Sequence, residues 1–129
     1  MADRTGPAPI VLLVEDDQDS RDMYVLGLQL SGLHAEAAAS GHEALAVLDR
    51  VRPAVVVTDL SLPDMDGLLL CQQLAEDPHT RDIPRIVLTG RTTDAAWETR
   101  LASSCRRVLQ KPCAPDELAT IITEVLTSS

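Results

Sequence analysis

The sequence predicts a domain of the α/β class, with five parallel strands and five helices that alternate along the chain. Three short, continuous apolar runs, at 10–14, 54–57 and 86–88, are typical of strands covered on both faces of a sheet. Between these runs the apolar residues recur at helical spacing. Strands that alternate with helices over short connections call for a parallel sheet sandwiched between two layers of helices.

The two remaining strands are predicted from weaker signals. Residues 34–39 lie between two helical patterns, and their alanines make them the least typical strand of the set. Val108 and Leu109 give a short apolar run near the C-terminal end. No repeat, low-complexity segment or linker-like stretch separates these units. We therefore expect one domain over residues 9–127, preceded by a flexible tail over residues 1–8.

The first two helices have recognisable ends. The first is expected over 19–31 and stops at Gly32, because glycine is the usual residue just after a helix. Three apolar residues fall on one of its faces: Met23, Leu26 and Leu30. The second begins at a capping box, in which Glu43 stands three residues after Ser40, and Pro53 closes it.

The later helices are predicted from apolar spacing and from proline. The third covers 67–76 and ends before Pro78, and the fourth, over 93–103, has a weaker pattern. The fifth begins at Pro115, because proline is favoured in the first turn of a helix. Its apolar stripe consists of Leu118, Ile121, Ile122 and Val125.

Composition narrows the class of protein. The chain has 129 residues, of which 45% are hydrophobic and 24% charged, so it can bury a core as a soluble domain. It has no Phe, and Tyr24 and Trp97 are its aromatic residues, so the core must be largely aliphatic. The formal net charge of -9 argues against direct binding to nucleic acid, which requires clustered Lys and Arg.

Sequence also bears on location. No stretch approaches the ~18 apolar residues of a membrane span, and the N-terminal residues lack the apolar centre of a signal peptide. The three histidines are scattered and are expected to face solvent. The three cysteines form no close-spaced pair and are expected to be buried free thiols: Cys71, Cys105 and Cys113. A reducing compartment, and hence the cytoplasm, is the expected location.

Polar side chains follow four of the predicted strands. Ligands of an open parallel sheet bind beyond the carboxyl ends of its strands, so these side chains would meet at one edge. In chain order they are Glu15, Asp16, Asp17, Asp59, Thr89 and Lys111. Carboxylates ~4 Å apart repel each other by a few kcal/mol at an effective dielectric of about 20. A divalent cation would relieve that repulsion.

Mg²⁺ is the cation that suits such a site, because it prefers oxygen ligands and keeps open positions for water or a phosphoryl oxygen. Lys111 would supply a second cation for a phosphoryl group, and Thr89 a hydroxyl donor. The set contains the parts that phosphoryl transfer requires, which are a nucleophile, a metal, a cation and a hydrogen-bond donor.

Four segments that contain these residues resemble the receiver domain of two-component response regulators. They are IVLLVEDDQDSR, VVVTDLSLPDMDG, RIVLTG and QKPCAPDEL, in this order and at spacings typical of the family. The match covers nearly the whole chain. It implies a flavodoxin-like, doubly wound sheet with the strand order 2-1-3-4-5.

The resemblance also implies a role for each residue. Asp59 would be the phosphoacceptor, taking a phosphoryl group from a sensor histidine kinase or a histidine phosphotransfer protein. Lys111 would contact the phosphoryl oxygens, Thr89 would move toward them, and the Lys111–Pro112 bond is expected to be cis. The domain would act as a signalling module rather than as an enzyme, although it would assist its own phosphorylation and slow dephosphorylation.

The metal ligands implied by the resemblance come from two segments. The EDD triplet allows two registers. We favour Asp16 as a direct Mg²⁺ ligand, with Glu15 acting through water or from just outside the ligand shell, because Arg21 then follows Asp16 at the interval usual in the family. Asp17 is an additional candidate ligand. Asp59 and the backbone carbonyl of Ser61 would complete the protein's contribution.

The expected output face departs from the family pattern. Receivers usually carry an aromatic residue three positions before the lysine, where this chain has Val108, and Cys113 replaces a common Phe. An aromatic switch therefore cannot operate at position 108, and the signal would travel through the fourth helix. Trp97, on that helix, would either pack against the core or contact a partner. An unknown output protein would bind the surface of the fourth helix, fifth strand and fifth helix, with dimer formation on phosphorylation as a further expectation.

Two alternatives follow from other classes of protein. A degenerate receiver would act as a binding module without phosphorylation. A phosphohydrolase with an aspartate nucleophile would turn over small phosphate esters. Phosphatases of the haloacid-dehalogenase type carry a second Asp two residues after the nucleophile, where this chain has Ser61.

Overall fold

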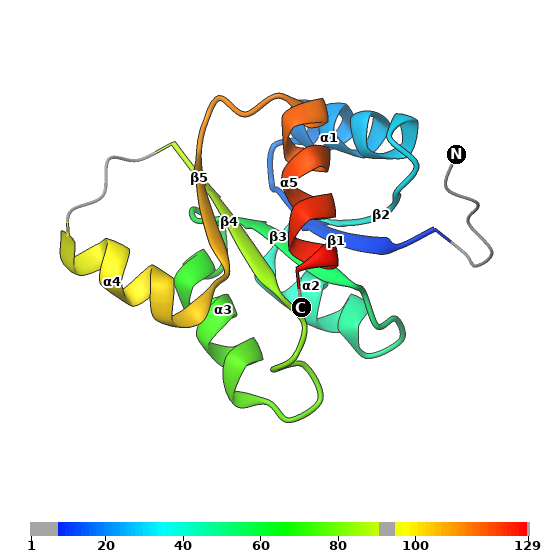
Figure 1. Cartoon of the computed structure of the whole chain (residues 1–129). Coiled ribbons are helices and arrows are strands. Elements are labelled where there is room, and N and C mark those ends of the chain that lie inside the picture. The colour runs from blue at the N-terminus through cyan, green and yellow to red at the C-terminus, as the bar shows by residue number, and fades with distance from the viewer. Residues whose placement is uncertain (1–7, 91–94, 129) are drawn as a thin grey trace.

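The computed structural model describes residues 8–90 and 95–128, and it places a parallel sheet between two layers of helices (Figure 1). The strands lie in the order β2-β1-β3-β4-β5, and every neighbouring pair is parallel. Their bounds are β1 (Ile10–Val14), β2 (His34–Ala38), β3 (Val55–Asp59), β4 (Arg85–Thr89) and β5 (Arg107–Gln110). The predicted fold class and strand order are confirmed. The tail predicted over residues 1–8 lies, apart from Ala8, outside the described residues.

Five helices connect and follow the strands. They are α1 (Gln18–Leu30), α2 (Gly41–Leu48), α3 (Gly67–Glu76), α4 (Ala95–Ser104) and α5 (Pro115–Thr127). The predicted bounds agree to within a few residues, and the predicted start of the fourth helix at Thr93 lies outside the described residues. None of the described helices combines the length and the apolar character that a membrane crossing requires.

Each face of the sheet has its own aliphatic core, because successive residues of a strand point to opposite faces. Val11 and Leu13 of β1 pack with α1 and α5 on one face. Leu12 and Val14 pack with α2 and α3 on the other. A third group, here called the α3–α4 cluster, contains Leu60, Leu68, Cys71, Val87, Leu101, Cys105 and, half-buried against them, Trp97.

The apolar face predicted for the first helix is not the face that packs on the sheet. Met23, Leu26 and Leu30 are 46%, 58% and 79% exposed, whereas Tyr24 and Leu28 are buried. Both sides of the helix carry apolar residues, so spacing alone does not select the buried one. The close contact with α5 decides it, because a Cβ at Gly27 would lie 2.2 Å from Cβ of Pro115.

Helix α2 begins at the predicted capping residue. Ser40 Oγ accepts a hydrogen bond from Glu43 N at 3.1 Å. The Glu43 side chain reaches back one residue further than in a standard capping box, since its Oε1 accepts from Ala39 N at 3.0 Å. The two bonds fix the turn that joins β2 to α2.

The three cysteines are buried and form no disulfide within the described residues. Burial raises the pKa of Cys71 to about 12 and that of Cys105 to about 11. Burial also raises the pKa of Cys113. Because the thiolate is the reactive form, these thiols are poor nucleophiles in the folded protein.

We expect all three thiols to react slowly with an aromatic disulfide reagent in the native protein and rapidly in denaturant. The release of the coloured thiol at pH 8 measures both rates, and full reaction in urea supplies the control. One equivalent that reacts at once in buffer would show that a cysteine is open to solvent.

Candidate phosphoacceptor and metal site

Two neighbouring strands deliver the acidic residues to one edge of the sheet. Glu15 follows β1 directly, and Asp59 is the last residue of β3. Val14 pairs with Thr58 across these strands, so the two carboxylates emerge side by side. The N–H of Glu15 donates to the carbonyl of Ala38 at 2.9 Å, which extends the contact between β1 and β2 by one residue. The register of the sheet therefore sets where the acids lie.

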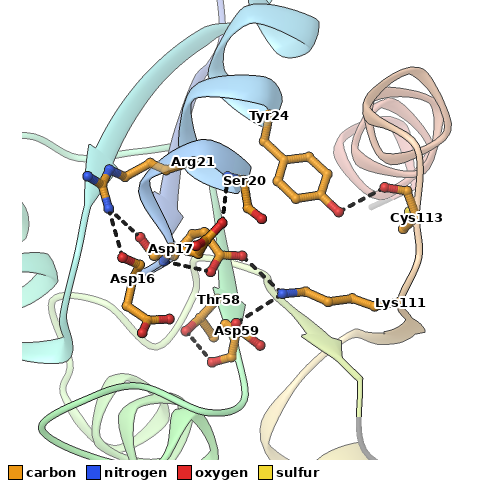
Figure 2. Close-up of polar contacts among 10 residues, drawn as sticks. Asp16, Asp17, Ser20, Arg21, Tyr24, Thr58, Asp59, Lys111 and Cys113 are labelled. Carbon is orange, nitrogen blue, oxygen red and sulfur yellow. Dashed lines mark hydrogen bonds and ion pairs between the residues drawn. The ribbon is translucent and has the colours of Figure 1, made fainter.

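Three carboxylates and one ammonium group converge at this edge. Glu15, Asp16 and Asp59 each offer an oxygen, and these oxygens lie within 4.8 Å of one another. Glu15 is 1% exposed and Asp59 is 9% exposed, whereas Asp16 is open to solvent. The Nζ of Lys111 donates to Glu15 Oε1 and to Asp59 Oδ2, each at 3.0 Å (Figure 2).

These surroundings change the pKa values of two groups. Burial raises the pKa of Glu15, and the negative charge of Asp59 raises it further. The hydrogen bond from Lys111 lowers this pKa but does not outweigh the burial. Burial alone would lower the pKa of Lys111, but its hydrogen bonds with Asp59 and Glu15 raise the pKa overall. Lys111 is therefore a cation at neutral pH, held between two acidic groups.

Arg21 fixes the turn that carries the first two acids. Its Nη1 donates to the backbone carbonyl of Glu15 at 2.9 Å and to that of Asp16 at 3.3 Å. Figure 2 shows this side chain folded back from α1 over the turn. The contact gives a physical reason for the interval between Asp16 and Arg21 on which the preferred register depends.

Thr89 and Lys111 approach the site from the neighbouring strands. Thr89 ends β4 and is 1% exposed, and its backbone carbonyl accepts from Lys111 N at 2.8 Å. Asp59 pairs with Leu88, the residue before Thr89. The Lys111–Pro112 bond is cis, as the resemblance implied. All four segments singled out in the sequence therefore meet at the carboxyl edge of the sheet.

The loop after Asp59 is closed tightly on itself. Gly67 N donates to the Leu60 carbonyl at 2.7 Å, and Ser61 forms an isolated antiparallel bridge with Asp66. Asp66 caps α3 by accepting from Leu68 N at 2.8 Å. Ser61 lies at the exposed start of this loop, two residues beyond Asp59.

Comparison with known proteins identifies the family. The family model described as the response regulator receiver domain matches residues 11–123. The chain belongs to this family. The transcriptional regulatory protein TrcR of Mycobacterium tuberculosis is 34% identical over 128 residues, which are 98% of this chain and 49% of TrcR. The chain spans about half the length of several curated relatives that it matches.

Solved receiver structures have the same fold as this receiver domain. Chemotaxis response regulator CheY4 of Vibrio cholerae gives a TM-score of 0.83 at 28% identity, covering 92% of this chain and 98% of CheY4. The receiver domain of sensor histidine kinase PA1611 from Pseudomonas aeruginosa gives 0.84 at 26% identity, covering 94% of this chain and 99% of that one. The latter structure is described with a magnesium ion coordinated in its active site cleft.

The donor set of this receiver domain fits Mg²⁺. The converging atoms are all carboxylate oxygens, and one of the three acids is open to solvent, so water positions remain. A soft metal would require thiolate or imidazole ligands, and the cluster contains neither. Receiver domains typically bind Mg²⁺ at such an acidic site, and the acids present here are suited to it.

Asp17 has a different place in this receiver domain. Its Oδ2 accepts from Ser20 N at 2.9 Å, and it is the N-cap of α1. This hydrogen bond lowers the pKa of Asp17. The group of converging carboxylates in the described part of the chain does not include it. The structure thus places Asp17, a candidate ligand in the sequence, in a capping position.

Sequence reasoning assigned no role to Tyr24. Its hydroxyl donates to the backbone carbonyl of Cys113 at 2.8 Å, and Figure 2 shows it reaching across from α1 to the segment after Lys111. The contact ties the Lys111–Pro112 segment to α1. A lone aromatic residue in an otherwise aliphatic helix was the signal that could have indicated it.

The two aspartates of the EDD triplet should differ in their effect on the Mg²⁺ affinity. Asp16→Asn is expected to weaken Mg²⁺ binding by at least about tenfold, since loss of even an outer-shell partner has effects of that size. Asp17→Asn should leave it nearly unchanged, because asparagine caps helices about as well as aspartate. Titration calorimetry measures both affinities. A larger loss of affinity in Asp17→Asn than in Asp16→Asn would show that Asp17, and not Asp16, is the direct Mg²⁺ ligand.

Proposed function

We propose that this receiver domain takes a phosphoryl group onto Asp59 from a sensor histidine kinase or a histidine phosphotransfer protein, within a two-component phosphorelay. The observation that carries the proposal is the fixed position of Asp59, at the end of a buried strand and 3.0 Å from the Lys111 ammonium group. Family membership supports a phosphoacceptor role in two-component signalling. The cytoplasmic location stays a prediction.

In the transfer, a carboxylate oxygen of Asp59 attacks the phosphorus of a phosphohistidine. The O–P bond forms, the N–P bond breaks, and the imidazole leaves with the electron pair. Lys111 stabilises the charge on the phosphoryl oxygens, and the Thr89 hydroxyl donates a hydrogen bond to them. Because Asp59 and Lys111 are already held together, little reorganisation is required.

The metal would be held by Asp16, Asp59 and the Ser61 backbone carbonyl, with Glu15 acting through water or from just outside the ligand shell. When bound, Mg²⁺ supplies positive charge that shields the carboxylates from the incoming phosphoryl group. Slow hydrolysis of the aspartyl phosphate would reset the domain. Its proposed role is that of a signalling module, and it has no separate substrate to turn over.

Phosphorylation would change protein contacts through α4 and the neighbouring β5 and α5. Support comes from the α3–α4 cluster, which joins Leu60, the residue after Asp59, to Trp97 on α4. Val108 on β5 is 40% exposed and is not aromatic, so we assign the shift to α4 itself. Binding of an output protein, or dimer formation on phosphorylation, would then occur on this surface.

The direct experiment combines the protein with acetyl phosphate and Mg²⁺ and follows intact mass and Trp97 fluorescence. We expect one phosphoryl adduct per chain, absent with EDTA, together with a fluorescence change from α4. Mg²⁺ binding without an adduct would contradict the proposal and favour a degenerate receiver. Sustained phosphate release from small esters would favour a phosphohydrolase instead.

A groove beside the site suits the docking of a donor protein. It has a volume of about 750 Å³, lies between α1 and the segment after β5, and includes Met23 and Lys111 in its lining. The exposed Leu26 and Leu30 lie on the same helix. The groove is continuous with the Lys111 side chain that meets Asp59, so a donor bound there would present its phosphohistidine to the site.

Met23→Gln is therefore expected to slow phosphoryl transfer from a histidine phosphotransfer protein by about fivefold or more, because Met23 lines the groove and is 46% exposed, and loss of ~1 kcal/mol of contact predicts this factor. Labelling by acetyl phosphate should be unchanged, because that donor needs no docking surface. Leu69→Gln is the matched control, since Leu69 on α3 is 45% exposed and lies off the groove. Equal loss with both donors would contradict a docking role.

A further inference from the structure

The loop between β3 and α3 is fastened to the start of α2 by contacts that the proposed chemistry does not use. Asp64 Oδ1 accepts from Gly41 N at 2.9 Å, and its Oδ2 accepts from His42 N at 2.8 Å. The Nδ1 of the His42 ring contacts the same Oδ2. We call these contacts the Asp64 clasp. Met65 packs beside it, since a Cβ at Gly41 would lie 2.5 Å from Met65 Sδ.

The Asp64 clasp completes the start of α2. Ser40 Oγ takes the N–H of Glu43, so the first three N–H groups of the helix all bond to side chains. Hydrogen bonds from His42 N and Gly41 N lower the pKa of Asp64 to about 2. Asp64 is therefore ionised across the neutral range, and the positive end of the helix favours that charge.

The Asp64 clasp also connects the two segments that carry the proposed metal ligands. Asp64 belongs to the loop that begins with Ser61, whose backbone carbonyl is a predicted ligand. The Asp64 side chain accepts hydrogen bonds from the start of α2, and α2 follows β2. Ala38, the last residue of β2, accepts the hydrogen bond from Glu15 N. A connected path thus runs from the Glu15 turn, through one backbone hydrogen bond to β2 and along the chain into α2, and then through the Asp64 side chain to the Ser61 loop.

We propose that Asp64 is a positioning residue that fixes the Ser61 loop relative to the Glu15 turn and so sets the separation of the Mg²⁺ ligands. The inference rests on the proposed function for the identity of the metal. Asp64 itself acts through the backbone of its loop, and the His42 ring adds a second contact to the same carboxylate oxygen. Besides the Asp64 clasp, this loop is held by its two ends and by the packing of Leu62 and Met65 against the core under α2 and α3.

Asp64→Ala tests this role, with Asp77→Ala as the matched control. Asp77 Oδ1 makes a similar contact with His79 N at 2.8 Å, but in the connection between α3 and β4, at the opposite edge of the sheet. We expect Asp64→Ala to weaken Mg²⁺ binding about tenfold by calorimetry. Asp77→Ala should not, and Asp64→Asn should recover part of the affinity, because it keeps one acceptor oxygen.

Hydrogen exchange of the metal-free protein, read by mass spectrometry, provides a second measurement. Asp64→Ala should speed exchange in residues 61–66 and at the start of α2, whereas Asp77→Ala should leave both segments unchanged. Unchanged affinity and exchange in Asp64→Ala would overturn the inference and leave the proposed function intact. Equal weakening by both variants would show a general loss of stability and would also overturn it.

The two proposals can fail separately. If the wild-type protein binds no Mg²⁺, the metal part of the proposed function is wrong. Hydrogen exchange then decides the remaining question, because faster exchange confined to the Ser61 loop and the start of α2 still supports the Asp64 clasp. Slow exchange in Asp64→Ala would mean that other contacts hold the loop.

Discussion

Asp59→Asn is expected to reduce the phosphoryl adduct from one per chain to none. The asparagine amide occupies the same space at the end of β3, but its oxygen lacks the charge that makes a carboxylate a nucleophile. Lys111 and the acidic turn stay in place, so the loss would be chemical rather than structural. Intact mass after acetyl phosphate treatment measures the adduct, and circular dichroism checks the fold.

Asp22→Asn is the matched control, because Asp22 is an exposed acid on α1 outside the converging group. It should label like the wild type. An adduct that persists in Asp59→Asn would place the phosphoacceptor elsewhere, and digestion followed by peptide mass analysis would locate it. Loss of the adduct in both variants would indicate a general effect of charge on the acidic edge.

Gly67→Ala is expected to lower the free energy of unfolding by about 3 kcal/mol, at the upper end of what overpacking usually costs. A Cβ at position 67 would lie 2.3 Å from the Asp59 carbonyl oxygen and 2.9 Å from the Leu60 Cα. Both neighbours are backbone atoms, so no flexible side chain can move aside. The small helix-forming advantage of alanine does not offset this clash.

Urea unfolding followed by circular dichroism measures the loss, and Gly90→Ala is its control. Nothing lies within 4 Å of a Cβ at Gly90, so that variant should change stability little. If Gly67→Ala remains folded, its Mg²⁺ affinity should also fall, because the shift that relieves the clash moves the end of β3. Equal stability of the two variants would show that the start of α3 yields more easily than the structure indicates.

The sequence by itself determined the fold class and which side chains gather at one edge of the sheet. Unbroken apolar runs followed by helical spacing identify a parallel sheet, because these periods reflect local backbone geometry. Once the sheet is parallel, Glu15, Asp16, Asp59 and Lys111 must share its carboxyl edge, since each follows a strand. The Ser40 cap could likewise be predicted, because the residues involved are neighbours in the chain.

Only the tertiary structure decided which face of α1 is buried and what the Asp17 side chain contacts. Helix α1 has apolar residues on both sides, and the close contact of Gly27 with Pro115 selects Tyr24 and Leu28 as the buried ones. The EDD triplet left Asp17 as an additional candidate ligand, and the structure instead shows its carboxylate as the cap of α1.

The partners of Lys111 and Asp64 also come from far along the chain. Lys111 meets Glu15 and Asp59 across 96 and 52 residues, and Asp64 meets His42 across 22. The spacing of apolar and polar residues in a segment indicates only its secondary structure and which residues share a face. Contacts of this kind depend on how the loops lie above the sheet edge, which is set by packing, and only the folded chain brings their atoms within hydrogen-bonding distance.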